Sequence, residues 1–339
     1  MRHTSVCGLL LLCVHFLFVN TRSASQNVQC QDVPPTPFYL SSVFAFMEVS
    51  PPRYLSVGDT VELNCTTFSI GWNRSETYLH LVWTKMDPGN RTKTVLVSQR
   101  GSKVISYRLG PVTHEHQGVY SCDIDLSSPN VKVFDWHQII WVADDSPRAS
   151  IYMMSHNRNQ FLPNEIFTVS CHLPDGNTHW KMMRFDKSFG TITECPNQVS
   201  SDRRLSCTVC SEYPWSEKLY WCENPAGERS NSLNINTAAD RVVLERPSLP
   251  VTEGEDVILR CLHRKPTQVK FSFNFNATYY KNDQLIGNTI DSLFTLKAVT
   301  KADEGVYKCR HPEDGDSSDS WITVKARPVE DQNKKITTS

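Results

Sequence analysis

Four cysteines near the middle of the chain have the spacing of a chemical site. They stand close together in the sequence and include a Cys-x-x-Cys pair: Cys195, Cys207, Cys210 and Cys222. Such spacing suits a zinc site or a redox pair. Against both, Cys222 stands at the strand spacing that pairs it with Cys171, and an oxidising compartment favours disulfides. We expect structural bridges, most simply Cys195 with Cys207 or Cys210, and the leftover cysteine paired with Cys30 or with another molecule.

A second candidate for chemistry is His114-Glu115-His116, because two imidazoles and a carboxylate can hold a metal. The triplet directly precedes Gln117-Gly-Val-Tyr120, where a turn between two strands is expected, so we interpret it as a solvated turn. The sequence has neither His-Glu-x-x-His nor Gly-x-Ser-x-Gly, and no phosphate-cradling glycine loop. We therefore expect no enzymatic activity, no metal and no cofactor.

The elements that must position these residues follow from a pattern that occurs three times. A strand ends in Cys, and about fifty residues later a second Cys follows a Tyr by two positions, which pairs Cys65 with Cys122, Cys171 with Cys222 and Cys261 with Cys309. A Tyr at that position ties off strand F of an immunoglobulin sandwich, and the paired cysteines join its two sheets. The pattern predicts an all-β chain of three tandem immunoglobulin-like sandwiches, built to bind and not to catalyse.

The chain of 339 residues is long enough for three such domains and processed ends. We expect a signal peptide at 1–25, domains at 46–143, 148–237 and 241–326, and a polar tail at 327–339. Trp83, Trp180 and Tyr279 are the expected strand C core residues. The middle domain has no Gly two residues before Tyr220, so its E–F turn must be made differently. Short linkers predict a bent rod.

Several features predict a secreted glycoprotein. The segment 1–25 has a basic start, a short apolar core and a small-residue end, as in a signal peptide. Ten of the twelve cysteines follow it, an even number that suits an oxidising compartment. Four sequons are glycosylation candidates: Asn64, Asn73, Asn90 and Asn276. The polar C-terminus predicts no membrane span, and the net charge of -1 argues against a general affinity for nucleic acid.

The end of the second domain and the third domain resemble the Fc receptor and Fc receptor-like family. The resemblance rests on Leu219-Tyr-Trp-Cys-Glu-Asn-Pro-Ala-Gly-Glu-Arg-Ser-Asn231, on the run from Val243 to Gly254, on Tyr279-Tyr-Lys-Asn282, and on Asp303-Glu-Gly-Val-Tyr-Lys-Cys-Arg-His-Pro-Glu-Asp314 with Ser320-Trp-Ile-Thr-Val324. It implies a soluble, secreted protein that binds the constant region of an immunoglobulin, with a signalling chain only where a membrane form exists.

The resemblance also implies where the partner binds. Family members use loops at one end of a sandwich and the C–C′ edge, which by position correspond to 263–266, 280–284 and 310–316 here. The candidate binding residues in these segments are Arg264, Lys265, Tyr280, Lys281, Arg310 and His311. Tyr280 and Arg310 are the preferred anchors, because Tyr and Arg are enriched among the residues that dominate binding energy. For each loop, a solvated turn is the alternative.

Two other functions compete with antibody binding. The divergent first domain, with a long loop between Cys65 and Trp83, suits a soluble cytokine-receptor ectodomain. Tandem sandwiches also suit a homophilic adhesion module. The antibody class, the domain that carries the site and the oligomeric state are not encoded in any motif of the sequence.

Overall fold

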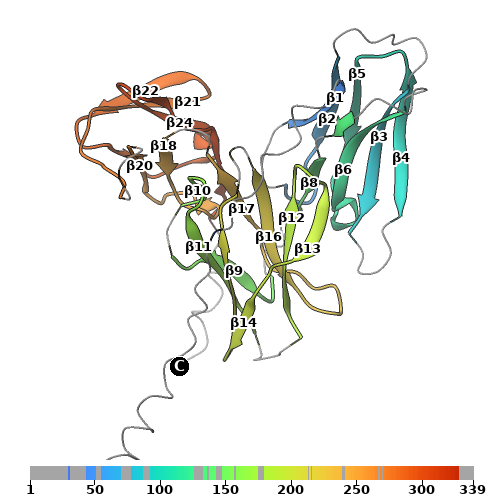
Figure 1. The fold of residues 1–339 in the computed structure, drawn as a ribbon, viewed down its shortest axis with the longest axis horizontal. Coiled ribbons are helices and arrows are strands. Elements are labelled where there is room, and N and C mark those ends of the chain that lie inside the picture. The colour runs from blue at the N-terminus through green and yellow to red at the C-terminus, as the bar shows by residue number, and fades with distance from the viewer. Residues whose placement is uncertain are drawn as a thin grey trace, which may run out of the picture.

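The computed structural model describes residues 30, 43–50, 55–69, 78–86, 92–125, 133–135, 137–142, 147–155, 158–174, 179–212, 214, 216–238, 241–265, 268 and 270–327. These residues form three β-sandwiches in chain order (Figure 1). The prediction of an all-β immunoglobulin-like chain is confirmed. The expected signal peptide, most of the polar tail, Asn73 and Asn90 lie outside the described residues.

The first domain packs a sheet of order β5-β2-β1-β7 on a sheet of order β4-β3-β6-β8. Its elements are β1 (Val43–Ser50), β2 (Val61–Ser69), β3 (Tyr78–Lys85), β4 (Lys93–Arg100), β5 (Val104–Leu109), the 3₁₀ helix η3 (His114–His116), β6 (Gly118–Asp125), β7 (Val133–Asp135) and β8 (His137–Ile140). In β2, Val61, Leu63 and Cys65 are buried, because alternate residues of a strand face the same side. Trp83 is only partly buried against this core, whereas Leu81 on the same strand is fully buried.

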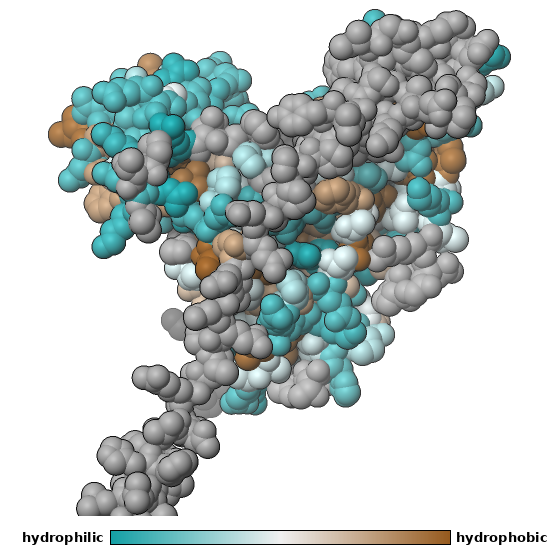
Figure 2. Space-filling view, in the orientation of Figure 1, coloured by the Kyte–Doolittle hydropathy of each residue, from teal (hydrophilic) through white to brown (hydrophobic). Residues whose placement is uncertain are grey.

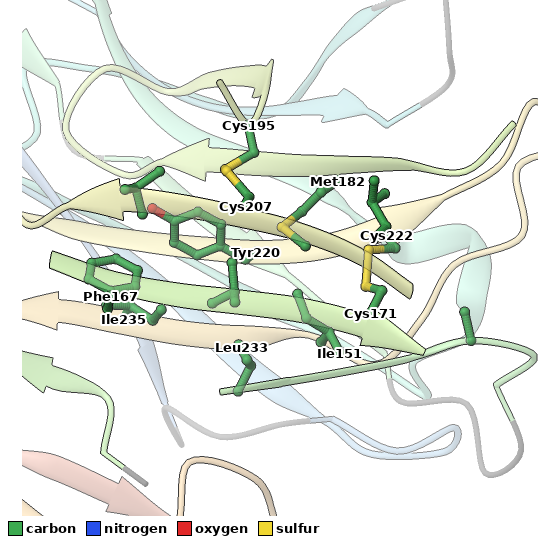
Figure 3. Close-up of a cluster of buried hydrophobic side chains, with 14 of the residues drawn as sticks. Ile151, Phe167, Cys171, Met182, Cys195, Cys207, Tyr220, Cys222, Leu233 and Ile235 are labelled. Atoms are coloured by element: carbon green, nitrogen blue, oxygen red, sulfur yellow. A yellow bond between two sulfur atoms is a disulfide. The ribbon is translucent and has the colours of Figure 1, made fainter. Parts of the chain in front are cut away.

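The second domain packs β14-β15-β11-β9 on β10-β17-β16-β12-β13. Its strands are β9 (Ser150–Met153), β10 (Gln160–Phe161), β11 (Ile166–His172), β12 (Lys181–Asp186), β13 (Thr191–Glu194), β14 (Gln198–Ser201), β15 (Arg204–Cys210), β16 (Glu217–Glu223) and β17 (Leu233–Thr237). Trp180 is buried in its core, beside Cys171, Cys222 and Tyr220. Figure 3 shows this core, with two disulfides bordering it.

The third domain packs β18-β20-β23 on a sheet of order β22-β21-β24-β25, in which β24 also pairs with β26. Its elements are β18 (Val242–Glu245), β19 (Val251–Thr252), β20 (Val257–His263), β21 (Ala277–Lys281), β22 (Gln284–Thr289), β23 (Leu293–Leu296), the 3₁₀ helix η4 (Lys301–Asp303), β24 (Gly305–His311), β25 (Gly315–Asp316), β26 (Ser320–Ile322) and β27 (Val324–Lys325). Tyr279 fills the core position where a sandwich usually has Trp, and its hydroxyl donates to the Ser292 carbonyl at 2.6 Å. That bond satisfies the phenol in an apolar setting.

Five disulfides join the described cysteines. Cys65–Cys122, Cys171–Cys222 and Cys261–Cys309 each link the two sheets of one sandwich. Of the alternatives open for the remaining four cysteines, the structure contains Cys195–Cys207 and Cys30–Cys210. The second bond ties the segment before the first domain to the middle domain. All four cysteines of the cluster are thus in disulfides, and none of them is a thiolate that could bind zinc.

The E–F turns explain why the first and third domains look alike in sequence and the middle one does not. Tyr120 donates to the His116 carbonyl at 2.9 Å, and Tyr307 donates to the Asp303 carbonyl at 2.7 Å, each closing a 3₁₀ turn. His116 Nδ1 accepts a hydrogen bond from the Thr113 amide, so this histidine caps η3. Between β15 and β16 no 3₁₀ turn is found among the described residues.

The first and third domains both pack on the middle domain, one on each side of it in Figure 1. An apolar cluster joins the first domain to the second, and a polar network together with another apolar cluster joins the second to the third. No helix in the described part of the chain is long and apolar enough to cross a membrane.

Candidate functional site

The two preferred anchors of the sequence analysis lie together on the outer face of the third domain. β21 and β24 are antiparallel neighbours, with Tyr280 opposite Lys308 and Thr278 opposite Arg310. Tyr279, Tyr307 and Cys309 point into the core, so the alternate residues on these strands point outward. The Arg310 guanidinium lies 5.1 Å from the centre of the Tyr280 ring, and Lys308 Nζ lies 5.8 Å from it. Both cations are thus within cation–π range of one phenol.

Two carboxylates hold these cations in place. Arg310 donates from Nε and Nη2 to the two oxygens of Asp316, the second bond at 3.0 Å. Lys308 donates to Asp283, across the C–C′ turn. Hydrogen bonding from Arg310 lowers the pKa of Asp316, and hydrogen bonding to Asp283 raises the pKa of Lys308. Asp316 and Lys308 therefore keep their charges at neutral pH.

An exposed leucine completes this face. Leu285 on β22 is opposite Tyr280 in register and is 60% exposed, while Arg310 has a side chain that is 50% exposed. The visible face of this domain is otherwise mainly hydrophilic (Figure 2). We name the set Tyr280, Asp283, Leu285, Lys308, Arg310 and Asp316 the Tyr280 surface. Exposed ion pairs contribute only about 0–1 kcal/mol to stability, so their main effect here is to orient Arg310 and Lys308.

The sequence analysis missed Lys308 and Leu285. Lys308 lies between two inward residues, Tyr307 and Cys309, so the period of two along strand F already placed it outward. Leu285 could not be recognised in the same way, because a β-bulge shifts the register between Tyr279 and Tyr280.

His311 does not belong to the Tyr280 surface. Its ring stacks on His263 at a centroid distance of 4.1 Å, and His263 is only 1% exposed. The segment 263–266, expected to be the B–C loop, begins within the sandwich, because His263 is the buried last residue of β20. Burial, and then the nearby His263, lower the pKa of His311.

His263, His311 and Asp314 bring three metal-ligating atoms within 4.8 Å of one another. Protein groups already engage them. His263 Nε2 lies 2.7 Å from Asp314 Oδ2, and Asp314 Oδ1 lies 3.6 Å from Arg241. His311 Nδ1 accepts the backbone N–H groups of Glu313 and Asp314 at 3.2 Å. These contacts within the protein shape the turn after β24.

The other three candidates are separated from Tyr280 and Arg310. Arg264 faces the middle domain, where its Nη1 lies 3.3 Å from Glu165 Oε1. It is thus a domain-contact residue and not a free loop tip. Lys281 donates to the Ala302 carbonyl and lies 5.8 Å from the Tyr307 ring, so it covers the E–F turn. Lys265 is exposed beside Arg264.

Two of the predicted glycosylation sites lie within the described residues, Asn64 and Asn276. They differ in their exposure to solvent. Asn276 is exposed just before β21. Asn64 is half-buried on β2, and its Oδ1 accepts a hydrogen bond from Ser106 at 2.5 Å. A sugar would attach at Nδ2 of Asn64, so Oδ1 can keep that bond. Both positions remain predictions as glycosylation sites.

Comparison with known proteins supports the domain type. The family model described as immunoglobulin domain matches residues 51–134 and 247–322, in the first and third sandwiches. The chain is similar to vascular endothelial growth factor receptor 2 of Rattus norvegicus, with 21% identity over 285 residues, which covers 76% of this chain and 21% of that protein. It is also similar to the CD166 antigen homolog of Carassius auratus, with 39% identity over 82 residues, 23% of this chain and 13% of that protein.

The chain spans about a fifth or less of the length of these two relatives, and neither is an Fc receptor. The resemblance to Fc receptors is therefore supported only at the level of the superfamily. Disulfide-rich immunoglobulin domains of this type are extracellular or displayed at the cell surface, and the family is typically non-enzymatic. The chain is an extracellular protein of the immunoglobulin superfamily with several immunoglobulin domains.

Proposed function

We propose that this protein is a secreted receptor-like protein that binds the constant region of an immunoglobulin through the Tyr280 surface. The observation that carries the proposal is Arg310 lying over the Tyr280 ring while Asp316 holds its guanidinium. Tyr and Arg are the residue types most often found at the centre of protein interfaces. The resemblance of this domain to Fc receptors is what points to an antibody as the partner.

The geometry suits rapid and specific docking. Arg310 and Lys308 are already fixed by Asp316 and Asp283, so less side-chain entropy is lost when a partner binds. Leu285 extends the apolar area next to the phenol, and Asp283 and Lys308 lie at the polar rim. An apolar centre within a charged rim is the usual composition of a protein-binding patch.

The test is binding of the full secreted chain to purified immunoglobulins of each class, immobilised on a sensor surface. Tyr280→Ala and Arg310→Ala should each weaken binding at least about tenfold, the loss that defines an important contact. Lys297→Ala is the matched control, because Lys297 also forms an exposed ion pair in this domain, with Asp256. Equal binding by all four proteins would rule out the Tyr280 surface, and no binding by the parent chain would rule out the antibody partner.

A second function is favoured by a specific finding. The similarity to vascular endothelial growth factor receptor 2 extends over 285 residues, more than any two of the three domains. A soluble ectodomain that binds a growth factor or cytokine is therefore the alternative. Retention of the protein by a cytokine and growth-factor panel, without retention by immunoglobulin, would favour it.

A further inference from the structure

A cavity of about 400 Å³ lies where the three domains meet. The first domain contributes β1 and β8, the second contributes Asn159 and strands β16 and β17, and the third contributes β26 and the segment after β18. Strands β8, β16 and β17 meet near the centre of Figure 1. The volume is within the range of about 300–1,000 Å³ that small-ligand sites occupy. The Tyr280 surface is not part of this cavity.

Two strands reach the cavity with an open edge. β1 pairs with β7 only from Val43 to Ala45, so Met47–Val49 have β2 on one side and no strand on the other within the described residues. In β8, Gln138–Ile140 have β6 as their strand neighbour. Gln138 Nε2 donates to the Met47 carbonyl at 3.4 Å, across the space between the two strands. Open edges offer backbone N–H and C=O groups to an incoming strand.

The walls also contain polar atoms without hydrogen bonds. Asn159 Oδ1, Asn236 Oδ1 and Trp321 Nε1 are shut off from solvent and have no hydrogen-bond partner in the described part of the chain. Asn159 is only 2% exposed. An unsatisfied buried group is destabilising, because it has lost its hydrogen bonds to water and gained none in the protein. All three residues line the cavity, so a ligand that lets these side chains turn inward could supply two donors and one acceptor.

Charge in the cavity is largely paired. Lys187 Nζ lies 2.7 Å from Glu217 Oε2, and Asn234 donates to the other oxygen of Glu217 at 2.7 Å. Burial disfavours the Glu217 carboxylate, but Lys187 and Asn234 outweigh it and lower the pKa of Glu217. Arg246 donates to Ser320 Oγ at 2.6 Å. Glu48 and Asp319 also line the cavity, so its five charged side chains sum to a charge of -1 and it favours a neutral or weakly basic ligand over an acidic one.

We infer that the three-domain cavity binds an extended, largely apolar peptide segment of another protein. Its backbone would displace the Gln138 amide from the Met47 carbonyl and add to the open edge of β1, and its N–H and C=O groups would meet Asn159, Asn236 and Trp321. Apolar side chains would contact Leu55, Trp141 and Phe185 in the walls. A sugar could also bond to the amides and the indole, but it would leave the edge of β1 unused. That edge therefore favours a peptide.

The experiment is a selection of short, phage-displayed random peptides on the whole protein, followed by affinity measurements with the enriched peptides made synthetically. Val49→Trp fills the cavity from β1 and should weaken binding of these peptides at least tenfold. Val57→Trp is the matched control in the same domain, because Val57 is 59% exposed and does not line the cavity. Tyr280→Ala should bind the peptides as the parent does, which keeps this test independent of the proposed antibody site.

A second measurement needs no variant. Hydrogen exchange of the parent protein with a bound peptide should slow at 47–49, where strand addition to β1 would protect the amides. The proposal is overturned if no peptide is enriched, if Val49→Trp binds as tightly as Val57→Trp, or if the protected amides lie elsewhere. Binding on an oligosaccharide array without any peptide binding would also overturn it, in favour of a glycan ligand.

Discussion

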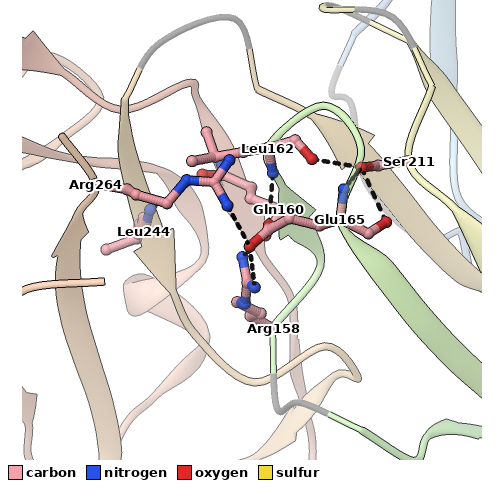
Figure 4. A network of polar contacts seen from close by, with 7 residues as sticks. All are labelled: Arg158, Gln160, Leu162, Glu165, Ser211, Leu244 and Arg264. Atoms are coloured by element: carbon pink, nitrogen blue, oxygen red, sulfur yellow. Dashed lines mark hydrogen bonds and ion pairs between the residues drawn. The ribbon is translucent and has the colours of Figure 1, made fainter. Parts of the chain in front are cut away.

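The middle domain contacts both neighbours through apolar clusters, but only its junction with the third domain adds a network of ion pairs and hydrogen bonds. Toward the first domain it presents Phe185, Leu219 and Trp221, which pack on Met86, Val119 and Trp141. The rings of Trp141 and Trp221 lie 5.3 Å apart. Toward the third domain it presents Arg158, Gln160 and Glu165, and Arg264 of the third domain lies 3.3 Å from Glu165 (Figure 4). The first junction is mainly apolar, with one hydrogen bond from Arg229 to the Met86 carbonyl. The second junction has an apolar cluster as well, Leu162 and Ala238 against Val243 and Leu262, and adds the polar network to it.

This difference indicates how the angle between each pair of neighbouring domains is fixed. Apolar contact is not directional and depends on the area removed from water, so small rotations cost little. Hydrogen bonds depend on direction: Gln160 accepts from the Leu244 amide at 3.0 Å and donates to the Ser318 carbonyl at 2.9 Å. Rotation of the third domain would break both bonds. We expect the second junction to be the more rigid of the two.

The largest loss of stability should come from removing the carboxylate that pairs with a buried arginine at the junction between the second and third domains. Glu165→Ala removes the carboxylate that pairs with Arg158, whose side chain is only 5% exposed. A buried charge without its partner destabilises by about 3–5 kcal/mol, so we expect a loss of about 4 kcal/mol in denaturant unfolding. Glu194→Ala, which removes an exposed pair with Lys181, should cost less than about 1 kcal/mol. Similar losses in both variants would show that the network is not buried in solution.

Disrupting the apolar contact between the first and middle domains should reduce the free energy of unfolding somewhat less. Trp141→Ala removes a buried ring at the contact with Trp221, and large-to-small changes of this kind cost about 3–5 kcal/mol. We expect about 3 kcal/mol, because Trp141 lies between domains that can partly close on the gap. Small-angle scattering should then show a larger maximum dimension, since the first domain is released. Tyr78→Ala, on an exposed side chain of the same domain, is the control and should leave the scattering unchanged. An unchanged curve for Trp141→Ala would mean that other contacts hold this angle.

Of the three changes, mild acidification should have the smallest effect on stability, and this effect should fall on the third domain. The pKa of His311 is lowered in the folded chain, so the unfolded chain binds the proton more readily. The resulting stability is complete above the ordinary histidine pKa of about 6.5 and is lost as the pH falls through the lowered value. His311 stacks on His263, next to the junction residue Arg264, so the third domain should weaken on mild acidification.

The measurement is thermal unfolding of the parent and of His311→Gln between about pH 7 and pH 5, the range in which histidine titrates. The parent should lose stability with falling pH, and the variant should show a flatter profile. His114→Gln, an exposed histidine of the first domain, should keep the slope of the parent. Equal slopes in all three proteins would assign the acid sensitivity to other groups.

Much of each sandwich was predictable because its signals are local. The period of two along the strands before Cys65 and Cys261 marks the buried face, and Tyr120 and Tyr307 mark the E–F corner. Tyr280 and Arg310 were chosen by residue type in segments expected to be loops, whereas the structure places them on the neighbouring strands β21 and β24. Arg264 was misjudged because an exposed basic loop and a domain contact read alike until the neighbouring domain is placed beside it.

The sequence by itself determined three disulfide-linked sandwiches, since strand period, cysteine spacing and the corner tyrosine are all properties of nearby residues. Only the tertiary structure decided that Cys30 bonds to Cys210, that Arg264 meets Glu165, and that all three domains wall one cavity. Those contacts join residues that stand far apart in the chain, in different domains or in different segments. Which of these residues contact one another depends on how the folded domains dock, and no local sequence pattern carries that information.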